Sequence, residues 1–346
     1  MIRIGIVGIG ATVSIAHFHA LGYLSDPRCR IAAVYDINTE GAHRFVKDHG
    51  LDAIVASSFD EMLDNVDAVS VCTPNAFHYC YASEALKKGK HVLVEKPMAT
   101  SIGECSSLND EAASACARSS IGLVYRFASP VAKARRIIEE NFSEIYTVSG
   151  WFGGKRLADP SVPFEWRMDR AKSGTGAFGD FMSHLIDMAS FITGCRIDTV
   201  SAFSSTFIKE RSVPGGMRAV ENDDATVLNA RSGGTLMQFT VSRVGMDDVM
   251  MIVTGDGGML QLSLRGNGSI VYWPKAKDGA YSGRMESIAI DGESNMEAWF
   301  KGEMPAFLDL IEGKESTAAS IEEGYYVEKV IEAGARSIQS GKEERV

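Results

Sequence analysis

A lysine at the end of an apolar run is the residue of this chain best suited to chemistry. The run 91–94 has the pattern of a buried strand, and Glu95, Lys96 and Pro97 follow it. In an open parallel sheet, ligands bind outside the carboxyl ends of the strands. Neighbouring strand residues point to opposite faces, so an ion pair between Lys96 and Glu95 has poor geometry. We therefore predict that Lys96 hydrogen-bonds a hydroxyl group in a ligand crevice.

A polar turn follows the preceding apolar run, residues 68–72. Thr73, Pro74 and Asn75 come next in the sequence. Pro74 cannot continue a strand ladder, so the chain is expected to turn there. Asn75 can cap the N-terminus of the following helix. This helix start is predicted to face the same crevice as Lys96, because both follow the carboxyl ends of strands.

The beginning of the chain carries a glycine turn that suits a dinucleotide. The turn follows the apolar run 2–7 and consists of Gly8, Ile9, Gly10, Ala11, Thr12 and Val13. Two glycines allow a tight turn and a close approach of a pyrophosphate, which the N-terminus of the next helix also attracts. Val13 replaces the third glycine of the usual fingerprint.

An acidic residue after the second apolar run indicates which dinucleotide fits. Asp36 could cap the next helix, or it could accept hydrogen bonds from an adenosine ribose. A carboxylate repels a 2′-phosphate, and the following Ile37 and Asn38 supply no arginine for one. The strand, the turn, the helix and the acid together favour NAD as the cofactor, with NADP less favoured.

A further constellation lies in a glycine-rich stretch that leads into a helix, residues 173–192. Asp180 and His184 are four residues apart and therefore share one helix face. Such a pair either stabilises the helix or handles a proton during catalysis. Trp166 and Arg167 precede the stretch, and Trp166 could equally be a packing residue.

These residues require a sheet to position them, and the first part of the chain alternates strands with helices accordingly. Apolar runs joined by helices indicate a parallel sheet that is covered on both faces. Right-handed crossovers make such a sheet doubly wound. Strands are expected over 2–7, 31–36, 68–72, 91–94 and 121–125, and helices over 11–24, 39–49, 77–88 and 102–117.

The pattern changes after residue 125, and we predict two domains, residues 1–125 and 126–346. The second is expected to be an α+β domain with a large, mostly antiparallel open sheet, because its short strands alternate with glycine-rich turns. Its last helix could pack back on the first domain. Strands are expected over 145–152, 200–207, 225–230, 235–242, 250–254, 259–264 and 269–273, helices over 130–141, 178–192, 295–311 and 321–340, and loops over 210–221 and 275–283.

Composition limits the classes of function. The chain has 45% hydrophobic and 23% charged residues, as globular proteins do. Its net charge of −10 argues against a nucleic-acid or anionic-membrane surface. It lacks an apolar run of roughly eighteen residues, so no membrane span is expected. The six cysteines and seven histidines lack metal-ligand spacing, which favours free thiols, no metal and a cytoplasmic location.

The segment that ends at Pro97 resembles the Gfo/Idh/MocA oxidoreductases, the family of glucose–fructose oxidoreductase and inositol dehydrogenase. The matching residues are Asn75, His78, Ala82, Ala85, Leu86, Gly89, Lys90, His91, Glu95, Lys96 and Pro97. The resemblance implies an N-terminal Rossmann domain and a C-terminal domain with a large open sheet. It implies that the cofactor contacts Gly8, Gly10, Ala11, Thr12, Val13, Asp36, Thr73, Pro74, Asn75, His78, Glu95 and Lys96.

The glycine-rich stretch is similar to a family segment in which an Asp and a His lie over the nicotinamide. The resemblance therefore implies that Lys96, Asp180 and His184 are catalytic. Ser173, Thr175 and Gly179 depart from the family's usual pattern in the loop. The implied substrate-binding residues are Lys96, Arg126, Trp166, Arg167, Asp180 and His184.

The implied reaction is NAD-dependent hydride transfer between a nicotinamide and a secondary hydroxyl of a sugar, a polyol or a cyclitol such as inositol. His184 is the expected general base, oriented by Asp180, while Lys96 hydrogen-bonds the reacting oxygen. Lys96 and His184 could exchange these roles. Two alternatives stay open: an NAD-retaining glycoside hydrolase of the same family, and a non-catalytic sensor of NAD or sugar. A sensor would not need these three residues.

The predicted C-terminal sheet also bears on assembly. A sheet with helices on one face leaves its other face to solvent or to a partner. We expect Leu236, Phe239 and Val241 to give that free face an apolar character. The expected assembly is a homodimer or homotetramer through this sheet, and the resemblance agrees. Neither nucleic acid nor a membrane is an expected partner.

Overall fold

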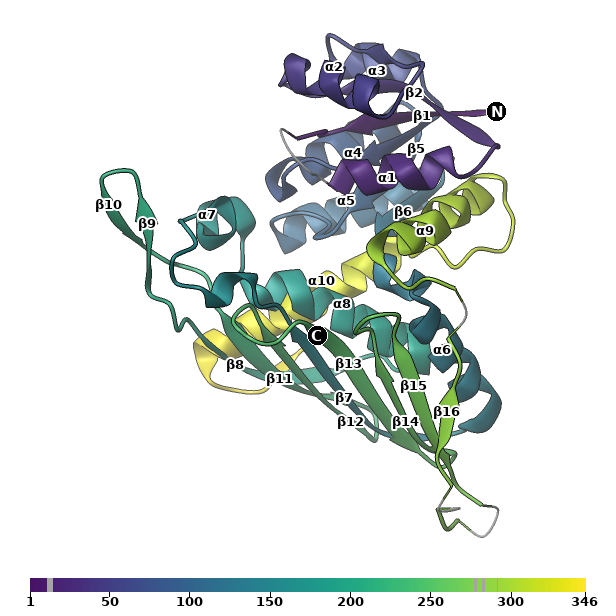
Figure 1. Ribbon diagram of the computed structural model, residues 1–346, viewed down its shortest axis with the longest axis vertical. Helices are drawn as coiled ribbons and strands as arrows, with labels where there is room; N and C mark the ends of the chain where they lie inside the picture. The colour runs from purple at the N-terminus through teal and green to yellow at the C-terminus, as the bar shows by residue number, and fades with distance from the viewer. Residues whose placement is uncertain (11–14, 277–278, 282–283, 291) are drawn as a thin grey trace. The chain divides into compact units, whose positions relative to one another are not determined.

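The computed structural model describes residues 1–10, 15–276, 279–281, 284–290 and 292–346. The predicted cofactor residues Ala11, Thr12 and Val13 lie outside this set. The chain forms two compact units (Figure 1). The first unit combines residues 1–127 with 296–326, and the second combines 128–295 with 327–346. Each unit is thus built from segments that are distant in the sequence.

A parallel sheet forms the centre of the first unit. Its strand order is β3-β2-β1-β4-β5-β6, and all neighbouring pairs are parallel. The chain reverses its winding direction between β1 and β4, which is where doubly wound sheets bind ligands. The predicted doubly wound fold is confirmed. The strands are β1 (Ile2–Val7), β2 (Cys29–Tyr35), β3 (Ile54–Val55), β4 (Ala68–Val71), β5 (His91–Glu95) and β6 (Ser119–Gly122).

Helices join these strands, and several begin where the sequence supplies a capping side chain. The side chains of Asn38, Ser58 and Ser101 accept hydrogen bonds from the first turns of α2, α3 and α5. The helices of this unit are α1 (Ile15–Leu24), α2 (Thr39–Asp48), α3 (Phe59–Asp64), α4 (His78–Lys87), α5 (Ile102–Ser114), α9 (Met296–Ile311) and the first residues of α10 (Ile321–Ser340).

Three short elements of the first unit differ from the prediction. The sequence patterns do not indicate β3 or α3, because two-residue strands and six-residue helices carry too little periodicity. The predicted strand 121–125 is wrong at its end. β6 stops at Gly122, and a 3₁₀ helix, η2 (Val124–Phe127), follows it.

The second unit is built on a nine-stranded sheet with the order β16-β15-β14-β13-β7-β12-β11-β8-β17. Only the pair β7 and β12 is parallel among these strands. The predicted large, mostly antiparallel sheet is therefore confirmed. The strands are β7 (Ile145–Gly153), β8 (Thr199–Ser205), β11 (Ala225–Ser232), β12 (Thr235–Ser242), β13 (Asp248–Gly255), β14 (Gly258–Ser263), β15 (Ser269–Pro274), β16 (Glu286–Ile288) and β17 (Glu344–Arg345).

One face of this sheet is covered by α6 (Ser129–Asn141), α8 (Ala177–Thr193) and the second part of α10 (Figure 1). Phe239 and Val241 of β12 are fully buried on this side, whereas Leu236 is 51% exposed. Side chains alternate along a strand, so residues 236 and 239 must face opposite sides. The prediction that placed all three on the free face is wrong for Phe239 and Val241.

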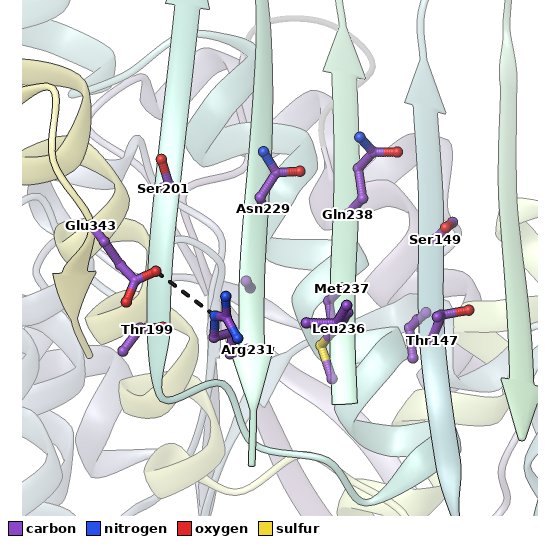
Figure 2. A pocket seen from close by; sticks show the side chains of 12 residues that line it. Thr147, Ser149, Thr199, Ser201, Asn229, Arg231, Leu236, Met237, Gln238 and Glu343 are labelled. Carbon is purple, nitrogen blue, oxygen red and sulfur yellow. Dashed lines mark ion pairs between the residues drawn. The ribbon is translucent and has the colours of Figure 1, made fainter. Parts of the chain in front are cut away.

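The free face of the sheet is mostly polar. A shallow hollow of about 320 Å³ lies on it, where Arg231 of β11 pairs with Glu343 at 3.9 Å (Figure 2). Leu236 is the exposed large apolar side chain in its lining, whereas Met237, which also belongs to the lining, is 4% exposed. The other residues labelled on this face in Figure 2 are Thr147, Ser149, Thr199, Ser201, Asn229 and Gln238.

A β-hairpin replaces the loop predicted over residues 210–221. Its strands are β9 (Glu210–Val213) and β10 (Gly216–Ala219). Arg211 of β9 is buried, and its guanidinium donates hydrogen bonds to the carbonyl oxygens of Leu157 and Asp159. These hydrogen bonds hold the hairpin in place, although its polar sequence has no apolar pattern that would predict strands. Within the described ranges, no helix is both long and apolar enough to cross a membrane.

Candidate active site

The glycine turn after β1 lies against the segment after β4. Gly8 has a φ of +88°, a left-handed conformation that glycine adopts without strain. A Cβ atom at this position would lie 2.4 Å from the backbone nitrogen of Thr73. Only glycine therefore allows the two strand ends to approach so closely. Both residues belong to the predicted cofactor site.

Asp36 follows β2 and organises the same turn. Its Oδ2 accepts a hydrogen bond from the Gly10 N–H at 3.1 Å, and its Oδ1 accepts one from the Asn38 N–H at 2.7 Å. The partly exposed carboxylate keeps lone pairs for further donors, so it fits the ribose hydroxyls of NAD. Asn38 caps α2, so Asp36 is not the cap of that helix.

The turn after β4 differs from the prediction in one respect. The chain enters a short 3₁₀ helix, η1 (Asn75–Phe77), before α4 begins at His78. Neither of these two described helices has a side-chain cap. Asn75 is therefore part of η1 and not the expected cap.

His78 links this turn to the segment that follows β5. Its Nδ1 lies 2.7 Å from the carbonyl oxygen of Pro97, and its Nε2 lies 2.7 Å from that of Thr73. A protonated ring would donate to both carbonyls, but burial outweighs them and lowers the pKa of His78. The ring is 1% exposed. The geometry thus gives His78 a positioning role.

Glu95 holds the strand end from which Lys96 emerges. Its Oε1 lies 2.9 Å from Nε2 of the fully buried His19, and its Oε2 accepts a hydrogen bond from the Lys96 N–H at 3.2 Å. A Cβ atom on Gly122 of β6 would lie 2.6 Å from Oε1, so the glycine makes room for this carboxylate. Lys96 itself is half-buried. Glu95 therefore anchors the backbone of Lys96 through a buried network.

Arg126, a predicted substrate residue, lies in η2 and is 4% exposed. Its Nη2 lies 2.8 Å from Oε1 of Glu323. Burial alone would raise the pKa of Glu323, but the charge and hydrogen bond of Arg126 outweigh it and lower that pKa. The pair ties η2 to the start of α10. The predicted contact of Arg126 with substrate stays a prediction.

In the second unit, Asp223 holds the N-terminus of α8. Its Oδ1 accepts a hydrogen bond from the Gly176 N–H at 2.9 Å, and its Oδ2 accepts one from the Phe178 N–H at 2.8 Å. A Cβ atom on Gly176 would lie 2.1 Å from the Asp223 carbonyl oxygen. The glycine-rich loop thus brings the start of α8 onto a cap that comes from a distant part of the sequence.

We expect the Asp223→Ala variant to lose about 1–2 kcal/mol of the free energy of unfolding, the usual cost of a lost helix cap. Urea unfolding of this variant and of wild-type protein measures the difference. Asp48→Ala, a change of an exposed aspartate in α2, is the matched control and should cost less than about 0.5 kcal/mol. Equal unfolding midpoints for both variants would contradict the role of Asp223.

Asp180 and His184 lie on the first turns of α8. Asp180 is partly exposed at a pocket, whereas His184 is 6% exposed. The ring of Phe152 lies 6.0 Å from the His184 ring, measured between centroids, and stacks on Phe181 at 4.3 Å. These rings restrict the orientation of the imidazole. In such a pair the imidazole can accept a proton, and the carboxylate can orient the imidazole.

The pocket beside Asp180 has a volume of about 350 Å³. Arg167, which was predicted to bind substrate, lines it, and the Arg167 guanidinium lies over the ring of Trp166 at 4.4 Å. Trp166 is 39% exposed and is thus not a plain packing residue. The complete lining is Gly154, Lys155, Arg156, Leu157, Glu165, Arg167, Asp180, Phe181, Arg243 and Asp247.

Sequence reasoning missed most of the charged residues in this pocket. Lys155 and Arg156 come shortly after β7, and Arg243 comes directly after β12. A charged residue after the end of a strand is the signal that identified Lys96, and it could also have indicated these residues. Arg243 is 4% exposed, so it is a buried residue of this pocket.

Comparison with known proteins places the chain in a family. Residues 2–123 match the family model described as "Oxidoreductase family, NAD-binding Rossmann fold", and residues 131–261 match the "GFO/IDH/MocA C-terminal domain". The chain therefore belongs to the Gfo/Idh/MocA oxidoreductase family, as its sequence indicated. Its N-terminal domain is an NAD-binding Rossmann domain, so the predicted cofactor is confirmed.

Several relatives are named dehydrogenases. Glucose-6-phosphate 3-dehydrogenase of Bacillus subtilis is 36% identical over 61% of this chain and 56% of its own length. Levoglucosan dehydrogenase of Pseudarthrobacter phenanthrenivorans is 28% identical over 70% of this chain and 64% of its own length. These two matches thus span less than two thirds of each relative. UDP-N-acetylglucosamine 3-dehydrogenase of Acidithiobacillus ferrooxidans is 25% identical over 95% of this chain and 98% of its own length.

The fold also has a close counterpart among solved structures. The crystal structure of an oxidoreductase domain protein from Kribbella flavida has a TM-score of 0.91 and 25% sequence identity, with 100% of both chains covered. Both domains of the present chain therefore share the architecture of that protein.

Proposed function

We propose that the protein is an NAD-dependent dehydrogenase that oxidises a secondary ring hydroxyl of a sugar. The observation that carries the proposal is Asp180, at a polar pocket, one helical turn from the buried His184. The chain that holds this pair also carries an NAD-binding domain. Two relatives named as 3-dehydrogenases of hexose derivatives support the hydroxyl at C3 as the reacting group.

The bound NAD supplies the hydride acceptor. The described residues predicted to hold it include Gly8, Gly10, Asp36 and Thr73. They offer a glycine turn at the ends of β1 and β4 and a carboxylate for the ribose.

The protein's own task is to manage the hydroxyl proton and the charge on the oxygen. We assign proton acceptance to the imidazole of His184, with Asp180 on the same helix face as its orienting carboxylate. The ammonium group of Lys96 hydrogen-bonds the reacting oxygen and stabilises the negative charge that develops there. His78 and Glu95 support this lysine by anchoring the segment around it.

A substrate screen tests this function. Purified protein is incubated with NAD and with hexoses, hexose phosphates, hexuronates, polyols and inositols, and the absorbance of reduced nicotinamide is followed. The proposal predicts net NAD reduction with at least one sugar. Cleavage of a glycoside without any net reduction of NAD would instead favour the hydrolase alternative.

We expect Asp36→Ala to weaken NAD binding about tenfold to a hundredfold, because hydrogen bonds to a charged group contribute about 1.5–3 kcal/mol. The variant should also discriminate less against NADP, since the repelling carboxylate is gone. Titration calorimetry with both dinucleotides measures these effects. Asp52→Ala, at an exposed position beyond the same β2–α2 region, is the control and should bind NAD as wild type does. Unchanged NAD affinity in Asp36→Ala would refute the assignment.

We further propose that the free face of the nine-stranded sheet joins two or more copies of the chain. Leu236 is exposed on this face among polar side chains (Figure 2). Phe203, which is 66% exposed, shares the side of β8 on which Thr199 and Ser201 lie. Light scattering at micromolar concentration should give the mass of a dimer or tetramer. Leu236→Glu should shift that mass towards the monomer, because it places a charge in an apolar contact. A monomeric wild-type protein would refute this assembly.

The six cysteines are consistent with a reducing compartment, and we propose a cytoplasmic location. All six are free thiols, including the buried Cys29, Cys72 and Cys105. Thiols of this kind persist in the cytoplasm. Recovery of the protein in an extracellular fraction would contradict the proposal.

A further inference from the structure

The pocket beside Asp180 contains more cationic than anionic side chains. Its lining includes four cations, which are Lys155, Arg156, Arg167 and Arg243. It includes three carboxylates, which are Glu165, Asp180 and Asp247. The volume of about 350 Å³ is in the range of small-molecule sites. The charged side chains that line the pocket therefore carry a net charge of +1.

Two of the cations are already paired with two of the carboxylates. Arg156 donates hydrogen bonds to both oxygens of Glu165, at 2.5 and 3.0 Å. Lys155 Nζ lies 3.0 Å from Asp247 Oδ2. Burial alone would raise the pKa of Glu165, but its arginine neighbours outweigh burial and lower it, so Glu165 is ionised. These two ion pairs leave Arg167 and Arg243 for other anions.

Arg167 forms only a long ion pair with a carboxylate. Its Nη1 lies 3.8 Å from Glu165 Oε1, which is longer than a hydrogen bond. The guanidinium instead lies over the Trp166 ring, and 42% of the side chain is exposed. It is thus held at the pocket with most of its N–H donors available to a ligand.

Arg243 is a buried cation without an ion pair among the described residues. Its side chain makes one hydrogen bond there, from Nη1 to the carbonyl oxygen of Arg167 at 3.1 Å. Asp180, Asp223 and Asp224 stabilise its charge only from a distance, and burial outweighs them, so the pKa of Arg243 is lowered. A buried cation that lacks a partner is costly, so this arginine requires a further acceptor.

Two of the three acids that act on Arg243 from a distance are occupied by other donors. Asp223 accepts hydrogen bonds from the N–H groups of Gly176 and Phe178 at the start of α8. Asp224 accepts hydrogen bonds from the backbone N–H groups of Phe207 and Ile208, at 2.6 and 2.8 Å. These two carboxylates are therefore engaged away from Arg243, and Asp180 is the acid of the pocket that acts on it from a distance.

We propose that the sugar substrate carries an anionic group, a phosphate or a carboxylate, which Arg167 and Arg243 bind in the pocket beside Asp180. This inference rests on the proposed function, because it assigns a substrate class to the same site. Guanidinium groups bind the oxygens of both anions in a bidentate manner. The anionic group would supply a further acceptor for Arg243, beside the carbonyl oxygen of Arg167.

Calorimetric titration in the presence of NAD tests the inference, with D-glucose, D-glucose 6-phosphate and D-glucuronate as probes. At least one anionic sugar should bind at least tenfold more tightly than glucose, and this preference should decrease as salt is added. Arg167→Gln and Arg243→Gln should each reduce the preference at least tenfold. Arg265→Gln, an exposed arginine between β14 and β15, is the control and should leave it unchanged.

The outcomes separate this inference from the proposed function. Tighter binding of the phosphate or of the uronate supports the inference and identifies the group. Equal binding of all three sugars, or binding of none, overturns it.

Oxidation of glucose without a preference for an anion leaves the dehydrogenase function intact. Preferential anion binding without oxidation of any sugar contradicts that function instead. If Arg243→Gln fails to unfold cooperatively, the partly exposed Arg167 position decides the test.

Discussion

Replacing Lys96 by methionine should reduce kcat by about a hundredfold to ten-thousandfold, while the affinity for NAD changes less than about threefold. Methionine keeps the length of the side chain but removes the charge and the N–H donors that would stabilise the developing oxyanion. Effects of this size are typical when a positioned proton donor or a charge-stabilising donor is removed. Turnover is measured as reduced nicotinamide formed with a sugar substrate, and NAD affinity by calorimetry.

The matched control for this variant is Lys88→Met. Lys88 lies at the end of α4, with its Nζ 3.2 Å from Asp60 on the exposed surface. Surface changes of this kind rarely alter stability by more than about 0.5 kcal/mol, so Lys88→Met should retain wild-type kcat. Near wild-type turnover in Lys96→Met would remove this lysine from the mechanism.

His184→Asn should have an effect of similar size on kcat, about a hundredfold to ten-thousandfold, because the proposed general base is lost. The imidazole is 6% exposed, so a surface role cannot account for such a loss. His43→Asn, a change on the exposed side of α2, is the control. Steady-state kinetics over a range of pH provides the measurement.

The pH profiles of the two variants decide which residue is the base. If His184 accepts the proton, His184→Asn should lose the acidic limb of the kcat profile, and Lys96→Met should retain it. The opposite pattern would exchange the two roles. If both variants kept near wild-type turnover, the proposed mechanism would be wrong. Removing both side chains together should cost much less than the product of the single effects, since residues that act as a unit are not additive.

Most of the fold could be predicted from local sequence patterns. β1, β12 and α10 begin and end where their apolar patterns do. Apart from the very short β3 and α3, one element that was missed is held by contacts with distant residues. The β9–β10 hairpin depends on the buried Arg211, whose acceptors are carbonyl oxygens some fifty residues earlier in the chain. A short polar segment gives no local sign of such an anchor.

The site residues that could be predicted are those that the neighbouring sequence marks. Lys96 follows a buried strand, and Asp180 and His184 share a helix face, so both signals lie within a few residues. Asp223 acts from far along the chain as the cap of α8, and spacing alone could not indicate it. Arg243 likewise follows a strand, but its burial depends on packing around the pocket that only the structure shows.

The central claim is that a hydride passes from a secondary ring carbon of a sugar to NAD, and isotope transfer tests it most directly. A hexose derivative that is oxidised in the substrate screen is prepared with deuterium at C3 and incubated with the protein and NAD. Mass spectrometry of the recovered cofactor then locates the label. We predict that the reduced nicotinamide contains one deuterium per turnover. Reduced nicotinamide without deuterium would contradict oxidation at C3, and product formation without any reduced nicotinamide would contradict the dehydrogenase function itself.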